Sequence, residues 1–388
     1  MRVLSHDSVS PSLFRSLSRE IQGRAAPITL IDEKPVYVYG AGALGRLAIE
    51  IMESIGVRTA GVIDADPDVK VLETCREKYP VSPMTSVPSE VRRGAVLAIA
   101  VAKAPYSETV SAVDLSSWSS VCPVYDILES KAHLQPVRNG WRTGHLDSSQ
   151  QSNLELLGDV LSDDASRAHY LSALAWHTLH EDWVFRSFPA LVRPHTGGDY
   201  WIPELRRVLE GPLRIIDVGA YHGSFLEDTI SSTGQIPCKY LGLEPDPDSF
   251  RILSDLVGNL RTSNEMVEIQ AVAAGNATEA LRFWPGLGYA SQGSPLGSLD
   301  VDQIVLGNLQ QEFNFVKIHC ESMDLEVLEG ARNLIAQRDC SVACTIYHGP
   351  ESFFGAPHLM SEIAPGRRVV VRQHAYMGTG VVAYSVPN

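Results

Sequence analysis

Short apolar runs alternate with longer amphipathic stretches along most of the chain. The first run lies in PVYVYGAGALG (35–45), where a β-rich segment ends in glycines, and a helical pattern follows over 44–55. Further strands are expected at 59–63, 96–101 and 121–125. Strands that alternate with helices predict a parallel sheet with helices on both faces, so we expect a small Rossmann-like α/β domain over residues 1–135.

The middle of the chain has a different pattern. Residues 140–152 are polar, whereas apolar residues between 154 and 179 recur at helical spacing. Ser162-Asp163-Asp164 lies between two such stretches and is expected to cap the second helix, because a short polar side chain can accept from the free N–H groups of a first turn. We therefore expect a helical connector or lid over residues 136–205.

A second strand-and-turn pattern begins at LRIIDVGAYHG (213–223). Strands are then expected at 239–244, 267–272, 315–319, 342–347, 369–372 and 381–386. The last two are too close for a crossover helix and should pair antiparallel. A mostly parallel, seven-stranded sheet that ends in an antiparallel C-terminal hairpin is the Rossmann-like arrangement of class I methyltransferases, and we expect it over residues 206–388.

Composition and charge narrow the classes of function. The 388 residues carry 32 Lys and Arg against 46 Asp and Glu, a formal net charge of −14. A nucleic-acid partner is not expected, because neutralising phosphates needs a concentrated basic stripe. No run approaches the roughly 20 apolar residues of a membrane span, the N-terminus has no signal-peptide core, and the cysteines show no CxxC pairing. We expect a cytoplasmic protein with a small-molecule ligand and no membrane partner.

The turn after the strand that ends in Asp217 carries the strongest candidate chemistry. Gly219 and Gly223 allow a tight turn whose backbone can approach a ligand before a helix begins. The next strand ends in Glu244, where an acidic side chain hydrogen-bonds a ribose diol. Because the turn differs from GxGxxG, the pair favours S-adenosylmethionine over NAD, although both acids could instead only cap loops. The predicted cofactor-binding residues are Asp217, Gly219, Ala220, Tyr221, Gly223, Glu244, Gln270 and Ala271.

Several segments from about residue 155 to the C-terminus resemble the FkbM-type methyltransferase family. They include LSDDASRAHYLSALAWHTL, IIDVGAYHGSF, YLGLEPDPDSF, FVKIHCESMDLEVLEGA, YHGPESF and VRQHAYMGTGVVAYSVP. Their order and spacing match those of the family. The resemblance implies a class I fold, S-adenosylmethionine as methyl donor and, usually, O-methylation of a small-molecule or sugar hydroxyl.

The segment KIHCES (317–322) departs from the family pattern, which resembles Lys-Ile-Asp-x-Glu-Gly. His319 replaces the usual Asp and Ser322 the usual Gly, while Glu321 is retained. An imidazole at this strand end could act as a general base near neutral pH. Two alternatives are a neutral exchange, since methyl transfer depends mainly on holding two reactants in line, and lost activity. We predict His319 and Glu321 as catalytic residues.

His348 and His374 are expected to line the acceptor pocket together with His319 and Glu321, because they follow predicted strands on the same side. The same set could hold a divalent metal that binds a diol. Since no HxH or HxxxH spacing supports such a site, no metal is predicted.

Three further features are expected near the pocket. Tyr200, in GGDYWIPEL, is predicted to fold over the cofactor and to bind the substrate, and Asp302 is a candidate pocket carboxylate or else a helix N-cap. The glycine-rich segment 284–298 is expected to lack regular structure and to form a loop over the active site, or else an ordinary exposed loop.

The N-terminal GAGALG (40–45), with Asp64 at the end of the next strand, resembles a dinucleotide fingerprint and the N-terminal domain of nucleotide-sugar acetyltransferases, as does KYPVSPM (78–84). This domain is expected to bind a nucleotide or the carrier group of a substrate. The alternatives are a structural role, for example as a homodimer interface, and a role in hydride transfer.

The predicted function is an S-adenosylmethionine-dependent O-methyltransferase. The alternative is a non-catalytic, nucleotide-binding or nucleotide-sugar-binding protein on a degenerate methyltransferase scaffold.

Overall fold

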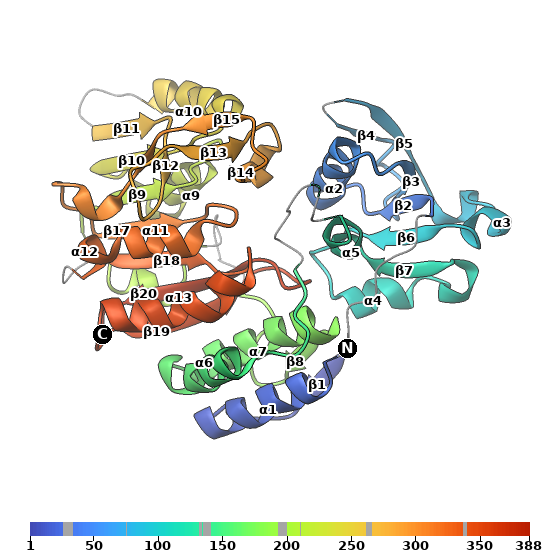
Figure 1. Ribbon diagram of the computed structural model, residues 1–388, viewed down its shortest axis with the longest axis horizontal. Coiled ribbons are helices and arrows are strands. Elements are labelled where there is room, and N and C mark those ends of the chain that lie inside the picture. Colours follow the sequence, from blue (N-terminus) through green and yellow to red (C-terminus); the bar gives the residue numbers. More distant parts are fainter. Residues whose placement is uncertain are drawn as a thin grey trace.

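Two α/β lobes lie next to each other above a layer of helices in the computed structural model (Figure 1). The structure describes residues 1–25, 34–74, 76–131, 134, 141–192, 200–209, 211–260, 266–336 and 340–388. Among these residues, no helix combines the length and the apolar character that crossing a bilayer requires.

The first lobe contains a six-stranded sheet of order β4-β5-β3-β2-β6-β7. Its strands are β2 (Val36–Tyr39), β3 (Thr59–Ile63), β4 (Val71–Glu73), β5 (Lys78–Ser82), β6 (Val96–Ile99) and β7 (Ser120–Pro123). Its helices are α2 (Ala43–Ser54), α3 (Ser89–Arg92), α4 (Tyr106–Ser111) and α5 (Val124–Glu129), with 3₁₀ turns η1 (Met84–Ser86) and η2 (Leu115–Ser117). The pairs are parallel except β4 with β5. The predicted parallel α/β sheet is therefore present, but its short antiparallel edge pair was missed because those strands are largely exposed and lack an apolar run.

The helical layer consists of α1 (Pro11–Gly23), α6 (Ser148–Val160) and α7 (Asp164–Leu179). The short strand β1 (Arg2–Leu4) pairs in parallel with β8 (Trp183–Phe185) beside these helices. The Asp163 side chain accepts from the Ser166 N–H at 2.7 Å, as predicted for the cap of α7.

The N-terminal segment belongs to this layer and not to the first sheet, which differs from the predicted domain span of 1–135. Phe14, Leu17 and Ile21 of α1 share one buried core with α6 and α7, and the Phe14 ring lies 5.9 Å from that of Tyr170. An amphipathic helix without a nearby partner in the sequence does not reveal which distant element covers its apolar face.

The second lobe contains a seven-stranded sheet of order β11-β10-β9-β17-β18-β20-β19. The strands are β9 (Arg214–Val218), β10 (Lys239–Leu243), β11 (Met266–Gln270), β17 (Phe315–Ile318), β18 (Ser341–Thr345), β19 (Arg368–Gln373) and β20 (Val381–Val386). Strand β20 is antiparallel to both of its neighbours, and the pairs from β11 to β18 are parallel. This is the class I methyltransferase fold, with the predicted antiparallel C-terminal hairpin.

Helices cover both faces of this sheet. They are α8 (Pro203–Arg206), α9 (Ser224–Thr233), α10 (Pro247–Leu260), α11 (Asp324–Gly330), α12 (Arg332–Ile335) and α13 (Pro350–Ile363). Successive residues of β9 point to opposite faces: Ile216 lies in the core that contains α11, α13 and the helical layer, whereas Ile215 lies in the core with α9 and α10. Burial on both faces explains the uninterrupted apolar runs of these strands.

The glycine-rich segment 284–298 has more regular structure than its composition predicts. Strands β13 (Leu281–Trp284), β14 (Gln292–Gly293) and β15 (Leu299–Val301) form a small antiparallel sheet, with a 3₁₀ turn η4 (Gly288–Ala290) between the first two. A Cβ at Gly297 would lie 2.3 Å from the Phe283 backbone. Here glycine permits close packing, so the expected lack of regular structure was wrong. The remaining short elements are β12 (Ala273–Ala274), paired with β16 (Gln303–Ile304), and η5 (Leu306–Asn308).

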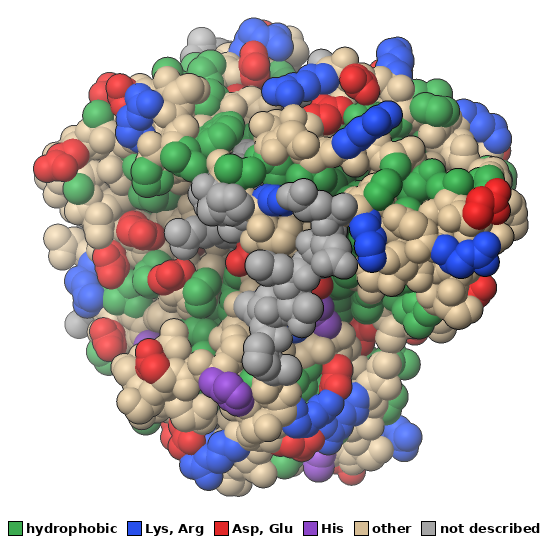
Figure 2. Space-filling view, turned by 45° about the vertical axis from the view of Figure 1, so that its right-hand side comes forward, with side chains coloured by type: hydrophobic (Ala, Val, Ile, Leu, Met, Phe, Trp, Pro, Cys, Tyr) green, Lys and Arg blue, Asp and Glu red, His purple; other side chains and the backbone are tan. Residues whose placement is uncertain are grey.

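The two lobes are joined through a shared apolar core. Leu287 and Ala290 of the glycine-rich segment and Met377 of the β19–β20 turn are buried in the cluster that contains α2 and α5 of the first lobe. The Tyr376 N–H donates to the Ala102 carbonyl at 3.0 Å. The carboxyl edge of the first sheet therefore faces the glycine-rich segment of the second lobe. The face in Figure 2 shows Lys and Arg side chains interspersed with acidic ones, without a single basic stripe.

Candidate active site

A cavity of about 480 Å³ lies at the carboxyl ends of β9, β10 and β17. Its position is the switch point of the parallel sheet, where the chain leaves adjacent strands in opposite directions and leaves a crevice for ligands. The wall includes Ala220, Tyr221, Glu244, Lys317, His319, Glu321 and Tyr347, with Gly288, Tyr289, Ser291 and Gly293 contributed by the glycine-rich segment. That segment therefore lies over the candidate site, as predicted.

The turn after β9 approaches the loop after β17 so closely that residue 219 must be glycine. Gly219 has φ +71°, and a Cβ there would lie 1.8 Å from the His319 carbonyl oxygen. Tyr221 also lies at positive φ, and its N–H donates to Glu244 Oε2 at 2.7 Å. Gly223, at φ +87°, begins α9 beside Leu256 and does not line the cavity. The predicted turn is thus present, and Gly219, Ala220 and Tyr221 form its cavity face.

Glu244 is held rigidly at the cavity wall. Its Oε1 accepts from the Asp246 N–H at 2.8 Å, while Oε2 accepts from Tyr221. The side chain is buried, which raises the pKa of its carboxyl to about 7 against the opposing effect of the two backbone donors. A carboxylate fixed in this way has further lone pairs with which to accept hydroxyl groups.

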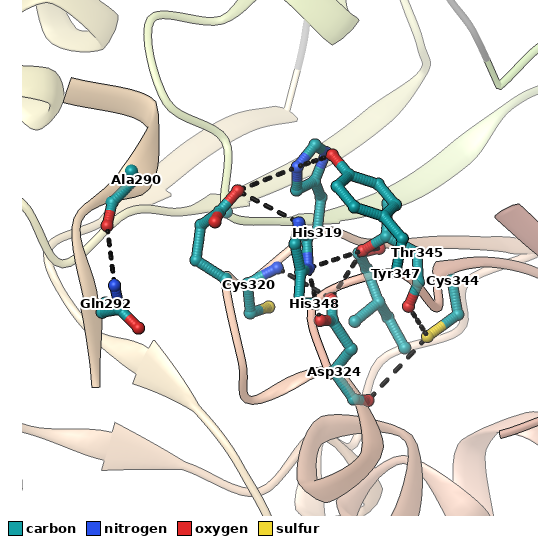
Figure 3. Close-up of polar contacts among 12 residues, drawn as sticks. Ala290, Gln292, His319, Cys320, Asp324, Cys344, Thr345, Tyr347 and His348 are labelled. Atoms are coloured by element: carbon teal, nitrogen blue, oxygen red, sulfur yellow. Dashed lines mark hydrogen bonds and ion pairs between the residues drawn. The ribbon is translucent and has the colours of Figure 1, made fainter. Parts of the chain in front are cut away.

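At the opposite end of the wall, three side chains from two loops converge (Figure 3). His319 and Glu321 follow β17, and His348 follows β18. Glu321 Oε1 lies 3.4 Å from His319 Nε2 and 3.1 Å from His348 Nε2. Two tyrosines flank this group: Tyr200 Oη lies 2.5 Å from His319 Nδ1, and Tyr347 Oη lies 3.3 Å from His319 Nε2.

Asp324, at the start of α11, supports the convergent group from the protein interior. Its Oδ2 lies 2.7 Å from His348 Nδ1, and its Oδ1 accepts from the Thr345 hydroxyl at 2.6 Å and from the Cys320 N–H at 2.9 Å. Asp324 is fully buried and was not among the predicted site residues. The sequence feature that could have identified Asp324 was its position in HCESMD, three residues after Glu321.

The electrostatics of this group follow from its two carboxylates. Burial alone would lower the pKa of His348, but Glu321 and Asp324 outweigh it and raise that pKa to about 10. Burial likewise opposes ionisation of Glu321, yet the two imidazoles lower its pKa to about 2. Burial lowers the pKa of His319. At neutral pH the group thus contains two ionised carboxylates held against imidazoles.

A family model described as the Methyltransferase FkbM domain matches residues 217–365, which include the Gly219 turn, Glu244 and the convergent group. These residues form an FkbM methyltransferase domain. A search of curated proteins finds no match.

One solved structure has a similar fold along nearly the whole chain. A methyltransferase FkbM from Methylobacillus flagellatus KT is matched over 95% of this chain and 93% of its own, at 15% identity and a TM-score of 0.61. A likeness at this identity concerns the fold, and it extends over nearly the whole chain. A magnesium protoporphyrin IX methyltransferase from Synechocystis PCC 6803 with bound SAM is matched over 46% of this chain and 71% of its own, at 11% identity and a TM-score of 0.26.

Asp217 of the FkbM domain, predicted to bind the cofactor, lies beneath the cavity and is not part of its wall. Its Oδ1 pairs with Lys317 Nζ at 2.8 Å, and its Oδ2 accepts from the Tyr240 hydroxyl at 2.6 Å. Lys317 Nζ also donates to the Gly219 carbonyl at 2.7 Å. Asp217 therefore supports the turn through Lys317, a wall residue that the prediction omitted although it stands in the KIHCES segment.

Gln270 and Ala271 of the FkbM domain also lie outside the cavity wall. Strand β11 ends at Gln270, whose side chain donates to Glu268 Oε1 at 2.6 Å. The chain turns into the cavity only afterwards, so Val272, Ala273 and Ala274 line it instead. The predicted residues thus lie on the strand that leads into the wall, which begins at Val272, directly after Ala271.

Asp302 and His374 are the two predicted acceptor residues that the fold places elsewhere. Asp302 is exposed between β15 and β16, begins no helix, and contributes only its carbonyl, which accepts from the Ala273 N–H. His374 contacts the Val192 carbonyl at 2.8 Å and the Tyr384 hydroxyl at 3.1 Å. Although His374 follows a strand on the expected side, that strand is β19, at the sheet edge and separated from β17 by two strands.

Proposed function

We propose that this chain is an S-adenosylmethionine-dependent O-methyltransferase that acts on a hydroxyl group of a small molecule, such as a sugar or a natural-product intermediate. The observation that carries the proposal is Glu244, a carboxylate fixed by two backbone N–H groups on the wall of the cavity. When bound, S-adenosylmethionine supplies the methyl group.

The residues around Glu244 fit this cofactor. Each carboxylate oxygen accepts one backbone hydrogen bond and retains capacity for a ribose hydroxyl. Gly219, where a Cβ would collide with the neighbouring loop, keeps the turn close to the cavity. Leu243, Val272 and Phe283 provide apolar wall beside the carboxylate, which suits the flat face of an adenine ring.

The acceptor hydroxyl is assigned to the end of the cavity at His319 and Glu321. Transfer of a methyl group to oxygen requires that the two reactants are held in line and that the hydroxyl loses its proton. His319 and Glu321 face the cavity. On the side away from the cavity, His348 contacts Glu321 and is itself held by Asp324. In its simplest form, His319 Nε2 accepts the proton while Tyr200 holds the ring through Nδ1, and Glu321, 3.4 Å from Nε2, stabilises the imidazolium that forms. The net charge of −14 supports a small acceptor over a nucleic acid.

Calorimetric titration with S-adenosylhomocysteine tests the cofactor assignment. We expect binding to the full chain, and an affinity at least tenfold weaker in Glu244→Ala, since two charge-assisted hydrogen bonds are lost, each worth about 1.5–3 kcal/mol. Glu268→Ala, an exposed acid on the neighbouring β11, should bind as the wild type does. Absence of binding, or equal affinity in Glu244→Ala, would contradict the proposal.

A methyl-transfer assay separates the enzyme from its alternative. The wild type should transfer a labelled methyl group from S-adenosylmethionine to a low-molecular-weight hydroxyl compound in a metabolite extract, and Glu321→Gln should transfer it more slowly. Binding of S-adenosylhomocysteine without any labelled product would favour the non-catalytic scaffold.

A further inference from the structure

The side chains of His319, Glu321 and His348 bring three possible metal-binding atoms together, and hydrogen bonds do not account for all of these atoms. Glu321 Oε1 and His348 Nε2 lie 3.1 Å apart, yet neither atom makes a hydrogen bond of acceptable geometry to any described residue. Both side chains are almost completely buried, with Glu321 5% and His348 0% exposed. Since buried polar atoms are normally satisfied, these two point to a partner at the place where they converge.

Two of the three spacings between the donor atoms match those around a small divalent cation. The distances from Glu321 Oε1 to the two Nε2 atoms are 3.1 and 3.4 Å, and all three donors lie within 4.8 Å of one another. In a tetrahedral zinc site with bonds of about 2.0–2.1 Å, neighbouring ligand atoms are about 3.3–3.4 Å apart. The two contacts of Glu321 therefore suit such an ion, which would hold both imidazole nitrogens beside this carboxylate.

Both imidazoles are held from behind through Nδ1, so that each presents Nε2 to the centre. Asp324 Oδ2 lies 2.7 Å from His348 Nδ1, and Tyr200 Oη lies 2.5 Å from His319 Nδ1. A carboxylate behind a metal-binding histidine fixes its tautomer and orientation and makes it a better ligand. Asp324 is itself fixed by Thr345 and the Cys320 N–H.

The backbone also holds Glu321 in place at a conformational cost. Glu321 and Ser322 have φ values of +32° and +84°, the left-handed region that non-glycine residues rarely adopt. Such strain persists where the surroundings determine the conformation, and it concentrates at functional sites.

We propose that His319, Glu321 and His348 bind a divalent transition-metal ion of the zinc type, with a fourth position open to the cavity for the acceptor oxygen. The role of the ion rests on the proposed function, whereas its binding does not. With the ion bound, His319 Nε2 is a ligand, and the ion would replace it as the group that promotes loss of the hydroxyl proton. Two imidazoles and one carboxylate favour zinc, cobalt or iron over Mg²⁺, which prefers oxygen ligands. His319 and Glu321 line the cavity beside Tyr347, so a ligand from the cavity can reach the ion, as in catalytic zinc sites.

Titration of the chelator-treated, untagged full chain with Co²⁺ and Zn²⁺ tests the site. We expect one ion per chain and, with Co²⁺, the visible absorption of a tetrahedral centre. Glu321→Gln, which keeps the shape of the side chain, and His319→Ala, which removes a ligand at the cavity wall, should each weaken binding at least tenfold. His358→Ala removes a half-buried histidine that contacts the Asn153 carbonyl and lies outside the cavity wall, and this variant should bind as the wild type does.

S-adenosylhomocysteine binding serves as the second readout, because it reports folding and the cofactor site independently of the ion. Glu321→Gln and His319→Ala should both still bind S-adenosylhomocysteine. Failure of the wild type to bind either ion while it binds S-adenosylhomocysteine would overturn the metal site and leave the proposed function intact. Ion binding that is as strong in both ligand variants as in the wild type would also overturn it. An ion bound without any S-adenosylhomocysteine binding would uphold the metal site and contradict the proposed function.

Discussion

At the scale of single residues, the candidate site depends on side chains that fix other side chains. Asp217 does not touch the cavity, yet it holds Lys317, which in turn binds the carbonyl of Gly219. Asp324 fixes His348 in the same indirect way. Residues that act through a neighbour are as buried as core residues, so their contribution is to geometry and not to direct contact with a ligand.

The close approach at Gly219 can be tested by adding a single methyl group. Gly219→Ala should lower the free energy of unfolding by about 2–5 kcal/mol, because a Cβ there combines positive φ with a contact of 1.8 Å. S-adenosylhomocysteine affinity should fall with it. Gly234→Ala is a matched control, since Gly234 has φ +72° but open space around a Cβ, and should cost about 1–2 kcal/mol. Equal losses in urea unfolding would show that the close contact has no effect.

At the scale of secondary-structure elements, the helical layer is joined to the edge of the methyltransferase sheet through the start of α7. Asp163 caps this helix and also pairs with Arg372 of β19, with distances of 3.1 and 2.9 Å between the two side chains. Ser162 N–H donates to the Val369 carbonyl at 2.9 Å. The loop that caps the start of α7 therefore also binds the edge strand β19.

Asp163→Ala should destabilise the chain by about 2–4 kcal/mol, because it removes a helix cap and leaves the buried Arg372 with less compensation. Burial would raise the pKa of Asp163, but Arg372 and Ser166 outweigh it and lower that pKa to about 2. A carboxyl with a lowered pKa stabilises the folded state above its unfolded value, and this contribution is lost as the pH falls toward 2.

Urea unfolding at pH 7 and at low pH measures both effects of this substitution. The difference between wild type and Asp163→Ala should shrink as the pH falls from about 4 toward 2. Asp159→Ala, which removes a surface pair with Arg15, should cost no more than about 1 kcal/mol. A difference that stays constant with pH would contradict the role of the Asp163–Arg372 pair.

At the scale of the whole molecule, the glycine-rich segment connects the two lobes. One side of it lines the cavity through Gly288, Tyr289 and Ser291, while Leu287 and Ala290 pack into the core of the first lobe. The first lobe thereby contributes to the position of a wall of the candidate active site.

Leu287→Ala should lower the free energy of unfolding by about 2–3 kcal/mol through loss of buried apolar contacts, and should weaken S-adenosylhomocysteine binding because the cavity wall loses its support. Leu296→Ala lies in the same segment, but that side chain is 53% exposed and its loss should change neither quantity. Urea unfolding and calorimetry on both variants decide the matter. Unchanged ligand affinity in a destabilised Leu287→Ala would show that the wall is positioned without the first lobe.

Much of the fold was predictable because it depends on local patterns. The apolar runs of the parallel strands, the glycine turn after Asp217, the Asp163 cap and the antiparallel C-terminal hairpin all arise from interactions within a few residues or one sheet. The missed elements include α1 and the short strands β1, β4, β5, β8 and β12 to β16, which are exposed, only a few residues long or covered by distant partners.

The sequence by itself determined the class of the second lobe, the glycine turn that faces the cavity and the place of the KIHCES segment at the end of a strand, since each is a contiguous motif with its own backbone preference. Only the tertiary structure decided which of the candidate histidines meet. His348 joins His319 and Glu321 because β18 lies next to β17, whereas His374 follows the edge strand β19 and lies apart. Strand order is set by long-range packing, so residues with the same local signal reach different places.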